Sequence, residues 1–210
     1  MLKEFIRKVK IRIFYFNNRI KLKNKNITIL SNNCTAGIIY HELKIKFLSP
    51  TINLLMEKFD FLNFVEHIED YKKSKLVEIK EPEKPYPVGI LINDKYGDIR
   101  IEFMHYKSFN EAEEKWNKRF ERINTNNLFV ILDIGPQVDP LLMEKFYKLN
   151  SKTKIALVPK NYNSPQCFGI SCYNENWHPG NLYEYDPKTG KKYLNEWNYV
   201  DFFNQKENKN

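Results

Sequence analysis

The residues best suited to chemistry in this sequence lie in the segment 31–37, which reads Ser-Asn-Asn-Cys-Thr-Ala-Gly. This segment follows an apolar run that is typical of a buried strand, and it precedes a predicted helix. In α/β proteins, ligands bind beyond the carboxyl ends of such strands, where the amide groups at the start of a helix can hold an anion. We therefore expect four residues of this segment to bind a substrate: Ser31, Asn32, Asn33 and Gly37.

Cys34 is the candidate nucleophile of this segment. A thiol near the start of a helix can have a lowered pKa and attack an electrophilic substrate. The alternative is a buried and inert cysteine, because structural thiols of that kind are common. The sequence has three cysteines, and their spacing fits neither a disulfide framework nor a zinc site: Cys34, Cys167 and Cys172. We expect no bound metal and no cofactor, and a reducing compartment.

A second polar group follows a later predicted strand. His105 is expected to act as a general acid or base, with a structural role as the alternative, and Tyr106 beside it is expected to bind substrate. Arg119 and Arg122 lie on the next predicted helix, and we expect them to neutralise the charge of a phosphate or carboxylate group of the substrate. The alternative is that both arginines form ion pairs with nearby glutamates of the same helix. Asp133 ends an apolar strand, where it is expected to bind a sugar hydroxyl, with a metal ion or the capping of the next turn as the alternatives.

The strands and helices that the hydrophobic pattern predicts must position these residues. Apolar runs predict strands at 25–31, 76–79, 88–92, 99–104, 128–132, 154–158 and 168–172, with the third and fourth forming a hairpin. Apolar spacing of three and four residues predicts helices at 2–22, 38–43, 59–73, 108–123, 141–149 and 195–203, and a helix start at 49–51. This alternation predicts a three-layer, Rossmann-like α/β fold, in which helices cover both faces of a mixed, mostly parallel sheet.

The net charge of +8 comes from the first 25 residues, which carry nine basic side chains and one acidic one. The other 185 residues carry equal numbers of basic and acidic side chains and have no net charge. Residues 2–22 predict an amphipathic helix, with a strand at 11–16 as the alternative. One face of this helix is apolar: Leu2, Phe5, Ile6, Val9, Ile13, Phe16 and Ile20. Such a helix can lie on an anionic membrane surface, or its apolar face can pack on the domain. Nucleic acid is disfavoured as a partner, since the remaining chain has no excess of basic residues.

The chain is therefore expected to consist of a basic N-terminal helix (1–25), one α/β domain (26–203) and a frayed tail (204–210). A domain of this length can bury a sizeable core. The N-terminus lacks the apolar core and cleavage site of a signal peptide, and no apolar run approaches the length of a membrane span. We expect a cytoplasmic protein, with peripheral binding at the inner face of the membrane through residues 2–22.

Several segments also form a family pattern, in this order: Ile29–Tyr40, Ser49–Leu54, Tyr86–Gly89, Phe103–Tyr106, Trp116–Arg119 and Arg122–Asn124. In these segments the chain resembles a bacterial family of unassigned function, whose members are often labelled exopolysaccharide biosynthesis proteins. The resemblance covers residues 26–158. One departure is Ala36, which stands where the family pattern has a glycine, and a side chain there weakens a phosphate-binding role for the turn.

The resemblance implies a role in the assembly of surface polysaccharides, and hence a glycan or nucleotide-sugar ligand. We expect a transferase of exopolysaccharide or capsule biosynthesis that acts on a nucleotide-sugar or a lipid-linked glycan. In that hypothesis the segment 31–37 holds the donor, His105 is the base, and Arg119 or Arg122 neutralises charge. The alternative is a non-catalytic glycan-binding or assembly protein of the same pathway.

Overall fold

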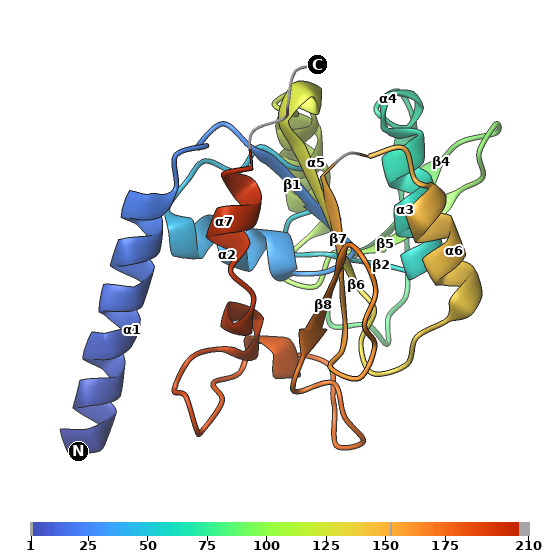
Figure 1. The fold of residues 1–210 in the computed structure, drawn as a ribbon. Coiled ribbons are helices and arrows are strands. Elements are labelled where there is room, and N and C mark those ends of the chain that lie inside the picture. The colour runs from blue at the N-terminus through green and yellow to red at the C-terminus, as the bar shows by residue number, and fades with distance from the viewer. Residues whose placement is uncertain (1, 152, 206–210) are drawn as a thin grey trace.

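The computed structural model describes residues 2–151 and 153–205, which include a parallel four-stranded sheet with the strand order β1-β6-β7-β8. This sheet lies at the centre of Figure 1. Its strands are β1 (Thr28–Ser31), β6 (Leu128–Asp133), β7 (Lys154–Pro159) and β8 (Cys167–Ile170). Ser31 pairs with Ile131, and Asp133 pairs with Leu157. The carboxyl ends of β1, β6 and β7 therefore meet at one edge of the sheet.

A second sheet is antiparallel and has the strand order β2-β5-β4-β3. Its strands are β2 (Leu55–Met56), β3 (Lys75–Ile79), β4 (Val88–Ile92) and β5 (Ile99–Glu102). The predicted hairpin of β4 and β5 is confirmed, and Val88 pairs with Glu102. The side chain of Asn93 fixes its turn by accepting hydrogen bonds from the N–H groups of Lys95 and Tyr96.

Helices lie between β1, β6 and β7 along the chain, whereas β8 follows β7 without an intervening helix. The α-helices are α1 (Leu2–Lys21), α2 (Thr35–Leu43), α3 (Lys58–Glu66), α4 (Ile68–Tyr71), α5 (Phe109–Phe120), α6 (Pro140–Lys148) and α7 (Tyr199–Phe203). Short 3-10 helices follow at η1 (Thr125–Asn127), η2 (Asn181–Tyr183) and η3 (Tyr193–Glu196). The predicted cap of α5 is confirmed, because Ser108 Oγ accepts a hydrogen bond from the Glu111 N–H at 3.3 Å.

Both faces of the parallel sheet are covered, which explains why its strands read as continuous apolar runs. On one face, Ile29 and Ile131 pack with α2, α7 and the C-terminal 3-10 helices. On the other face, Leu30 and Leu132 pack with α3, α5, α6 and the antiparallel sheet. The predicted three-layer α/β fold is therefore confirmed, with the antiparallel strands forming a sheet of their own (Figure 1).

Three predicted helices differ from the structure. The helix start predicted at 49–51 is wrong, because these residues lie in an irregular connection. There the hydroxyl groups of Ser49 and Thr51 form a hydrogen bond of 3.0 Å. The single helix predicted at 59–73 is broken at His67, whose backbone angles (φ −119°, ψ 32°) are not helical. The helix predicted at 195–203 is divided between η3 and α7.

The N-terminal prediction of a helix is confirmed, and the alternative strand at 11–16 is wrong. The outer apolar side chains do not pack on the domain, as described below, and the side chain of Leu2 lies outside those that the structure describes. The frayed tail is wrong at its first residue, since the Asn204 side chain bonds the backbone of Lys21 and Lys23, both at 2.8 Å. Residues 206–210 lie outside the described residues. Within residues 2–151 and 153–205, no helix combines the length and the apolar character needed to cross a bilayer.

Candidate functional site

The carboxyl ends of β1 and β6 are joined by side chains that continue the pairing of the two strands. Asn32 accepts a hydrogen bond from the Asp133 N–H at 2.8 Å and donates one to the Asp133 carbonyl oxygen at 3.2 Å. The backbone carbonyl oxygen of Asn32 accepts a hydrogen bond from the Met56 N–H at 2.8 Å. Through its side-chain amide and its backbone carbonyl group, the buried Asn32 connects the two sheets and has a structural role.

The carboxylate of Asp133 is the centre of a buried polar group. Its oxygens accept hydrogen bonds from Asn33 Nδ2 at 2.5 Å, from the Tyr173 hydroxyl at 2.5 Å and from the Gly135 N–H at 3.1 Å. Burial raises the pKa of Asp133, and these donors together with the Lys58 charge oppose that rise. Burial, followed by the negative charge of Asp133, raises the pKa of Tyr173 far above its ordinary value. Tyr173 is therefore held as a neutral donor at any physiological pH.

The segment 31–37 satisfies its own polar groups. Ser31 Oγ donates to the Asn33 carbonyl oxygen at 2.6 Å and accepts from the Ala36 N–H at 2.9 Å. Asn33 Oδ1 accepts from the Thr35 N–H at 3.1 Å. Two of the first N–H groups of α2 are thus already bonded within the segment. The predicted cradle for an anion gains no support from this geometry.

Ala36 lies within α2 and needs no positive φ, so the missing glycine of the family pattern carries no backbone strain here. Gly37 has a packing role, because a Cβ atom at this position would lie 2.9 Å from Asn53 Oδ1. Burial raises the pKa of the Cys34 thiol to about 11, so the thiol is protonated at neutral pH. These positions read as structural, and the nucleophile hypothesis for Cys34 is disfavoured.

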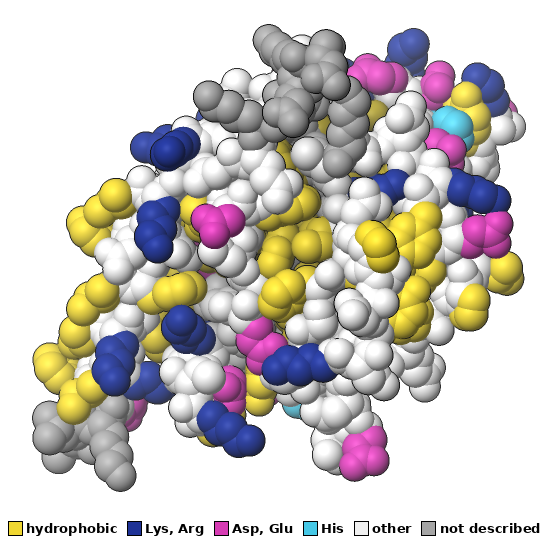
Figure 2. All heavy atoms as spheres, viewed as in Figure 1, with side chains coloured by type: hydrophobic (Ala, Val, Ile, Leu, Met, Phe, Trp, Pro, Cys, Tyr) yellow, Lys and Arg dark blue, Asp and Glu magenta, His cyan; other side chains and the backbone are white. Residues whose placement is uncertain are grey.

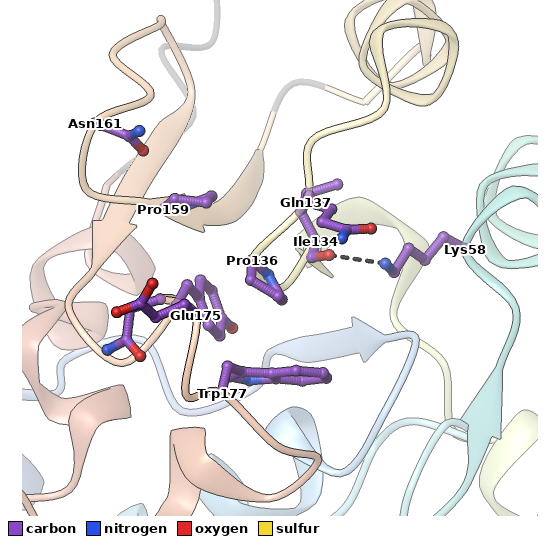
Figure 3. A pocket seen from close by; sticks show the side chains of 10 residues that line it. Lys58, Ile134, Pro136, Gln137, Pro159, Asn161, Glu175 and Trp177 are labelled. Carbon is purple, nitrogen blue, oxygen red and sulfur yellow. Dashed lines mark hydrogen bonds between the residues drawn. The ribbon is translucent and has the colours of Figure 1, made fainter.

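A cavity of about 640 Å³ opens above this buried group, beyond the ends of β6 and β7 (Figure 3). It is lined by Lys58, Ile134, Pro136, Gln137, Pro159, Asn161, Tyr173, Asn174, Glu175 and Trp177. Asp133 lies behind Tyr173 and holds that wall of the cavity in place. The position matches the general rule that ligands of α/β sheets bind beyond the carboxyl ends of the strands.

The walls of the cavity come from distant parts of the chain. In Figure 3, Lys58 of α3 lies opposite Glu175 and Asn161, and Trp177 lies below Pro136. Lys58 Nζ donates a hydrogen bond to the Ile134 carbonyl oxygen at 2.7 Å, which fixes the ammonium group at the rim.

Gly135 lies in the turn after β6, between the hydrogen-bonded group around Asp133 and the cavity. It has a φ of 75°, a conformation that favours glycine, and a Cβ atom there would lie 3.9 Å from the Trp177 ring.

The cavity combines the groups that bind sugars and phosphates. An indole ring offers an apolar face with one N–H donor, and amide and carboxylate side chains bond hydroxyl groups. The ammonium group of Lys58 retains two further protons that can bond an anion. The buried layer beneath is fully paired, since no described buried side-chain N or O atom lacks a hydrogen-bond partner. The exposed polar side chains of the cavity therefore lie at its rim, above a buried layer whose hydrogen bonds fix its shape.

The other predicted residues form a separate group. The Tyr106 hydroxyl donates to the Ile52 carbonyl oxygen at 2.8 Å and accepts from Arg119 Nη1 at 2.5 Å. The Arg119 guanidinium also lies 5.3 Å from the centre of the Phe47 ring. Tyr106 and Arg119 thus stabilise the connection before β2, and neither lines the cavity beyond β6 and β7.

His105 and Arg122 are both exposed on the surface, away from the residues that line the cavity. The structure therefore gives no geometric support to His105 as a base or to Arg122 as a phosphate contact. Among the described residues, no group of three or more His, Cys, Asp and Glu side chains is placed to hold a metal ion.

Of the residues predicted from the sequence, the structure brings together Asn32, Asn33 and Asp133, whereas most of the cavity wall was not predicted. Tyr173 and Trp177 lie in a stretch with no periodic pattern, which reads only as loop. The one available signal is the density of aromatic and Asn residues between 161 and 190, a composition typical of hydrogen-bonding surfaces. Lys58 gave no signal, because a lysine at the start of a helix is common on any surface.

Comparison with known proteins places nearly the whole chain in a family of unknown function. Residues 5–204 match the family described as "Domain of unknown function (DUF1919)". An uncharacterized protein of Haemophilus influenzae is 34% identical over 194 residues, which is 91% of this chain and 91% of the relative. The match includes α1 and the C-terminal segment that carries Tyr173 and Trp177, neither of which belongs to the segments of the family pattern.

Proposed function

Because the chain belongs to the DUF1919 family, whose function is unknown, we propose an activity from the cavity itself: it binds a sugar that carries phosphate. The observation that carries the proposal is the pairing of Trp177 with Lys58 across the cavity (Figure 3). The sugar ring stacks on the indole, and the phosphate bonds the ammonium group. Asn161, Asn174 and Gln137 supply amide partners for the hydroxyl groups.

The proposed process is exopolysaccharide or capsule biosynthesis, in which the chain acts as a transferase on a nucleotide-sugar or lipid-linked glycan. What supports this process is the family resemblance together with a cavity suited to such substrates. The volume of about 640 Å³ lies within the range of small-molecule sites, and is large enough for a sugar and its phosphates.

A transferase also needs a base for the hydroxyl group that attacks the donor. Among the described residues that line the cavity, Glu175 carries the single carboxylate, and its side chain is exposed at the rim. In the proposed step, the acceptor oxygen bonds to the sugar carbon while the phosphate leaves with the bonding electrons. Glu175 takes the proton of the acceptor hydroxyl, and Lys58 stabilises the charge on the leaving phosphate. Tyr173 donates its one hydroxyl proton to Asp133, so in this step it shapes the cavity wall and donates no hydrogen bond to the substrate.

A ligand screen by thermal shift tests the binding. The wild type is melted with nucleotide sugars, sugar 1-phosphates, the free sugars and inorganic phosphate. We expect sugar phosphates and nucleotide sugars to raise the melting temperature, and Trp177→Ala and Lys58→Ala to remove that rise. Leu141→Ala, which changes an exposed side chain on α6, is the control and keeps the response. A screen in which no sugar phosphate or nucleotide sugar changes the melting temperature overturns the proposal.

The non-catalytic alternative is separated from the transferase by Glu175→Gln. The ligand found in the screen is incubated with protein and candidate acceptors, and products are measured by mass spectrometry. A transferase forms product with the wild type but not with Glu175→Gln, while both bind the ligand. Binding without product in either protein favours a glycan-binding or assembly protein of the same pathway.

A further inference from the structure

Helix α1 has two opposite faces, and only one of them packs on the domain. On the packed face, the Tyr15 hydroxyl donates to Glu42 Oε1 at 2.9 Å, and at the edge of that face Arg19 Nε donates to the Glu42 carbonyl oxygen at 2.8 Å. Lys191 Nζ lies 4.5 Å from the centre of the Phe14 ring on the same face. The helix is thus attached to α2 and to the C-terminal segment largely by polar contacts.

The outer face of α1 carries six large apolar side chains that are exposed. They are Phe5 (66% exposed), Ile6 (43%), Val9 (37%), Ile13 (54%), Phe16 (59%) and Ile20 (66%). Figure 2 shows such yellow side chains along the outer edge of α1 at the lower left, with dark blue basic side chains beside them. A contiguous apolar strip of this kind on a protein surface marks an interaction site.

The spacing places these six side chains on one strip of the helix. With about 100° between successive residues, they fall within an arc of about 100°. The centre of this arc lies opposite the half-buried Ile11, Tyr15 and Asn18, which pack on the domain. The outer face therefore points directly away from the protein, along a helix about 30 Å long.

Basic side chains border the outer face on both sides. Lys10 and Lys21 lie along one border, and Lys8, Arg12 and Arg19 lie along the other. Over residues 4–21, the helix carries six basic side chains and Glu4 alone as an acidic one. At one border, a hollow of about 540 Å³ is lined by Arg12, Ile13, Phe16, Arg19 and Lys44. Three cations there surround an opening beside two apolar side chains.

We propose that the outer face of α1 binds an anionic membrane surface, with the helix lying flat in the lipid headgroup layer. In this position Phe5, Phe16 and Ile20 enter the apolar boundary, while the flanking lysines and arginines contact lipid phosphates. The hollow between Arg12 and Lys44 accommodates an anionic headgroup. A second copy of the chain fits less well, because two outer faces would bring together two rows of like charges.

This inference is independent of the cavity beyond β6 and β7, which the outer face does not touch. It adds a location to the proposed function, since a transferase held at the membrane would meet lipid-linked acceptors there. A failure of membrane binding would leave the sugar-phosphate proposal intact, and the reverse also holds.

Vesicle co-sedimentation tests the inference with the full chain. The probes are vesicles of neutral phosphatidylcholine alone and vesicles containing 30 mol% phosphatidylglycerol. We expect the wild type to bind the anionic vesicles at least about tenfold more strongly than the neutral ones, and salt to weaken that binding. The variant Phe5→Ser/Phe16→Ser/Ile20→Ser is expected to lose binding to both.

Two matched controls separate the outer face from a general effect of the substitutions. Serine has about the same helix propensity as Phe and Ile, and the replaced side chains are more than half exposed, so the triple variant is expected to fold. Leu141→Ser removes an equally exposed apolar side chain from α6 and should bind vesicles like the wild type.

For charge, two triple variants to Gln are compared. Lys10, Arg12 and Lys21 lie at the border of the outer face, whereas Lys72, Lys73 and Lys80 are exposed elsewhere. Only the first variant should weaken binding to the anionic vesicles.

Three results would overturn the inference. The first is a wild type that does not bind either type of vesicle. The second is a wild type that sediments as a dimer without lipid and becomes a monomer in the serine variant, with no vesicle binding. The third is salt-sensitive binding to RNA or DNA without binding to anionic vesicles. Circular dichroism of each variant confirms that a loss of binding is not a loss of folding.

Discussion

The buried carboxylate of Glu42 gives the sharpest prediction for how α1 is held. Glu42 is 4% exposed and accepts hydrogen bonds from four side chains that belong to three different segments. These donors are Tyr15, Lys192, Asn195 and Tyr199, at 2.8 to 3.1 Å. Glu42→Ala removes both carboxylate oxygens at once, and Tyr15 keeps only its longer hydrogen bond to Asn195 Oδ1 at 3.3 Å.

The magnitude follows from the burial of the donors. Tyr199 and Asn195 are 1% and 8% exposed, so each is left with an unsatisfied donor, at a cost of about 1–3 kcal/mol. Lys192 and Tyr15 are partly exposed and can turn to water, so they add little. The expected loss is about 4 kcal/mol in the free energy of unfolding, or roughly 8–16 °C in melting temperature for a chain of this size.

Thermal and guanidinium unfolding, followed by circular dichroism, measure this loss. The matched control is Glu144→Ala, which breaks an exposed pair with Lys148 and is expected to cost about 0.5 kcal/mol or less. A melting temperature of Glu42→Ala within about 2 °C of the wild type would refute the reasoning, because it would show that the four donors do not depend on Glu42.

The same group predicts a dependence on alkaline pH. Burial, followed by the charge of Glu42, raises the pKa of Tyr15 and of Tyr199 above the ordinary value of 10. The folded state therefore favours the protonated phenols, and the stability they contribute is present below pH 10 and is lost as the pH rises above it. We expect the melting temperature to fall steeply above pH 10. A flat profile up to pH 11.5 would contradict the burial of these phenols.

The remaining predictions concern the three cysteine thiols, the positive φ of Gly135 and the N-cap of α5. Burial raises the pKa of Cys34 to about 11 and that of Cys172 to about 12, so a thiol reagent at pH 8 should label the half-buried Cys167 first and the other two only after unfolding, as counted by mass spectrometry. Rapid labelling of Cys34 would restore the nucleophile hypothesis. Gly135→Ala should cost about 1–2 kcal/mol of stability, because φ is 75° there, and should weaken ligand binding, whereas an unchanged melting temperature would argue against that conformation. Ser108→Ala should lower the free energy of unfolding by about 1 kcal/mol, because α5 loses its N-cap hydrogen bond. An unfolding midpoint equal to that of the wild type would show that this hydrogen bond does not stabilise the fold.

The regular elements were predictable because they follow local patterns. The capped start of α5, the hairpin of β4 and β5 and the apolar strands β6 and β7 each depend on a few neighbouring residues. The break between α3 and α4 was not predictable, because His67 leaves the helix to stack on the Tyr96 ring, 3.5 Å away between ring centres. That contact joins residues 29 positions apart, which no window of sequence can show.

The candidate site was predictable only where it follows strand ends. Asn32, Asn33 and Asp133 lie together because β1 and β6 are adjacent parallel strands. Tyr173 and Trp177 reach the same place through an irregular segment, whose course is set by contacts with the finished sheet.

The sequence also did not predict which face of α1 packs on the domain. The helix has a second strip with Ile11 and Phe14, and the apolar pattern alone assigns the larger strip to the core. The polar contacts of Tyr15 and Arg19 with Glu42 reverse that assignment.

The central claim is that Trp177 binds a sugar that carries phosphate, and intrinsic tryptophan fluorescence tests it most directly. Trp116 and Trp197 are buried in the core, whereas Trp177 lines the cavity and is partly exposed. Titration with the sugar phosphate or nucleotide sugar found in the screen is predicted to change the emission saturably, and Trp177→Phe is predicted to abolish that change. A saturable change that persists in Trp177→Phe, or no change in the wild type at any concentration, would contradict the claim.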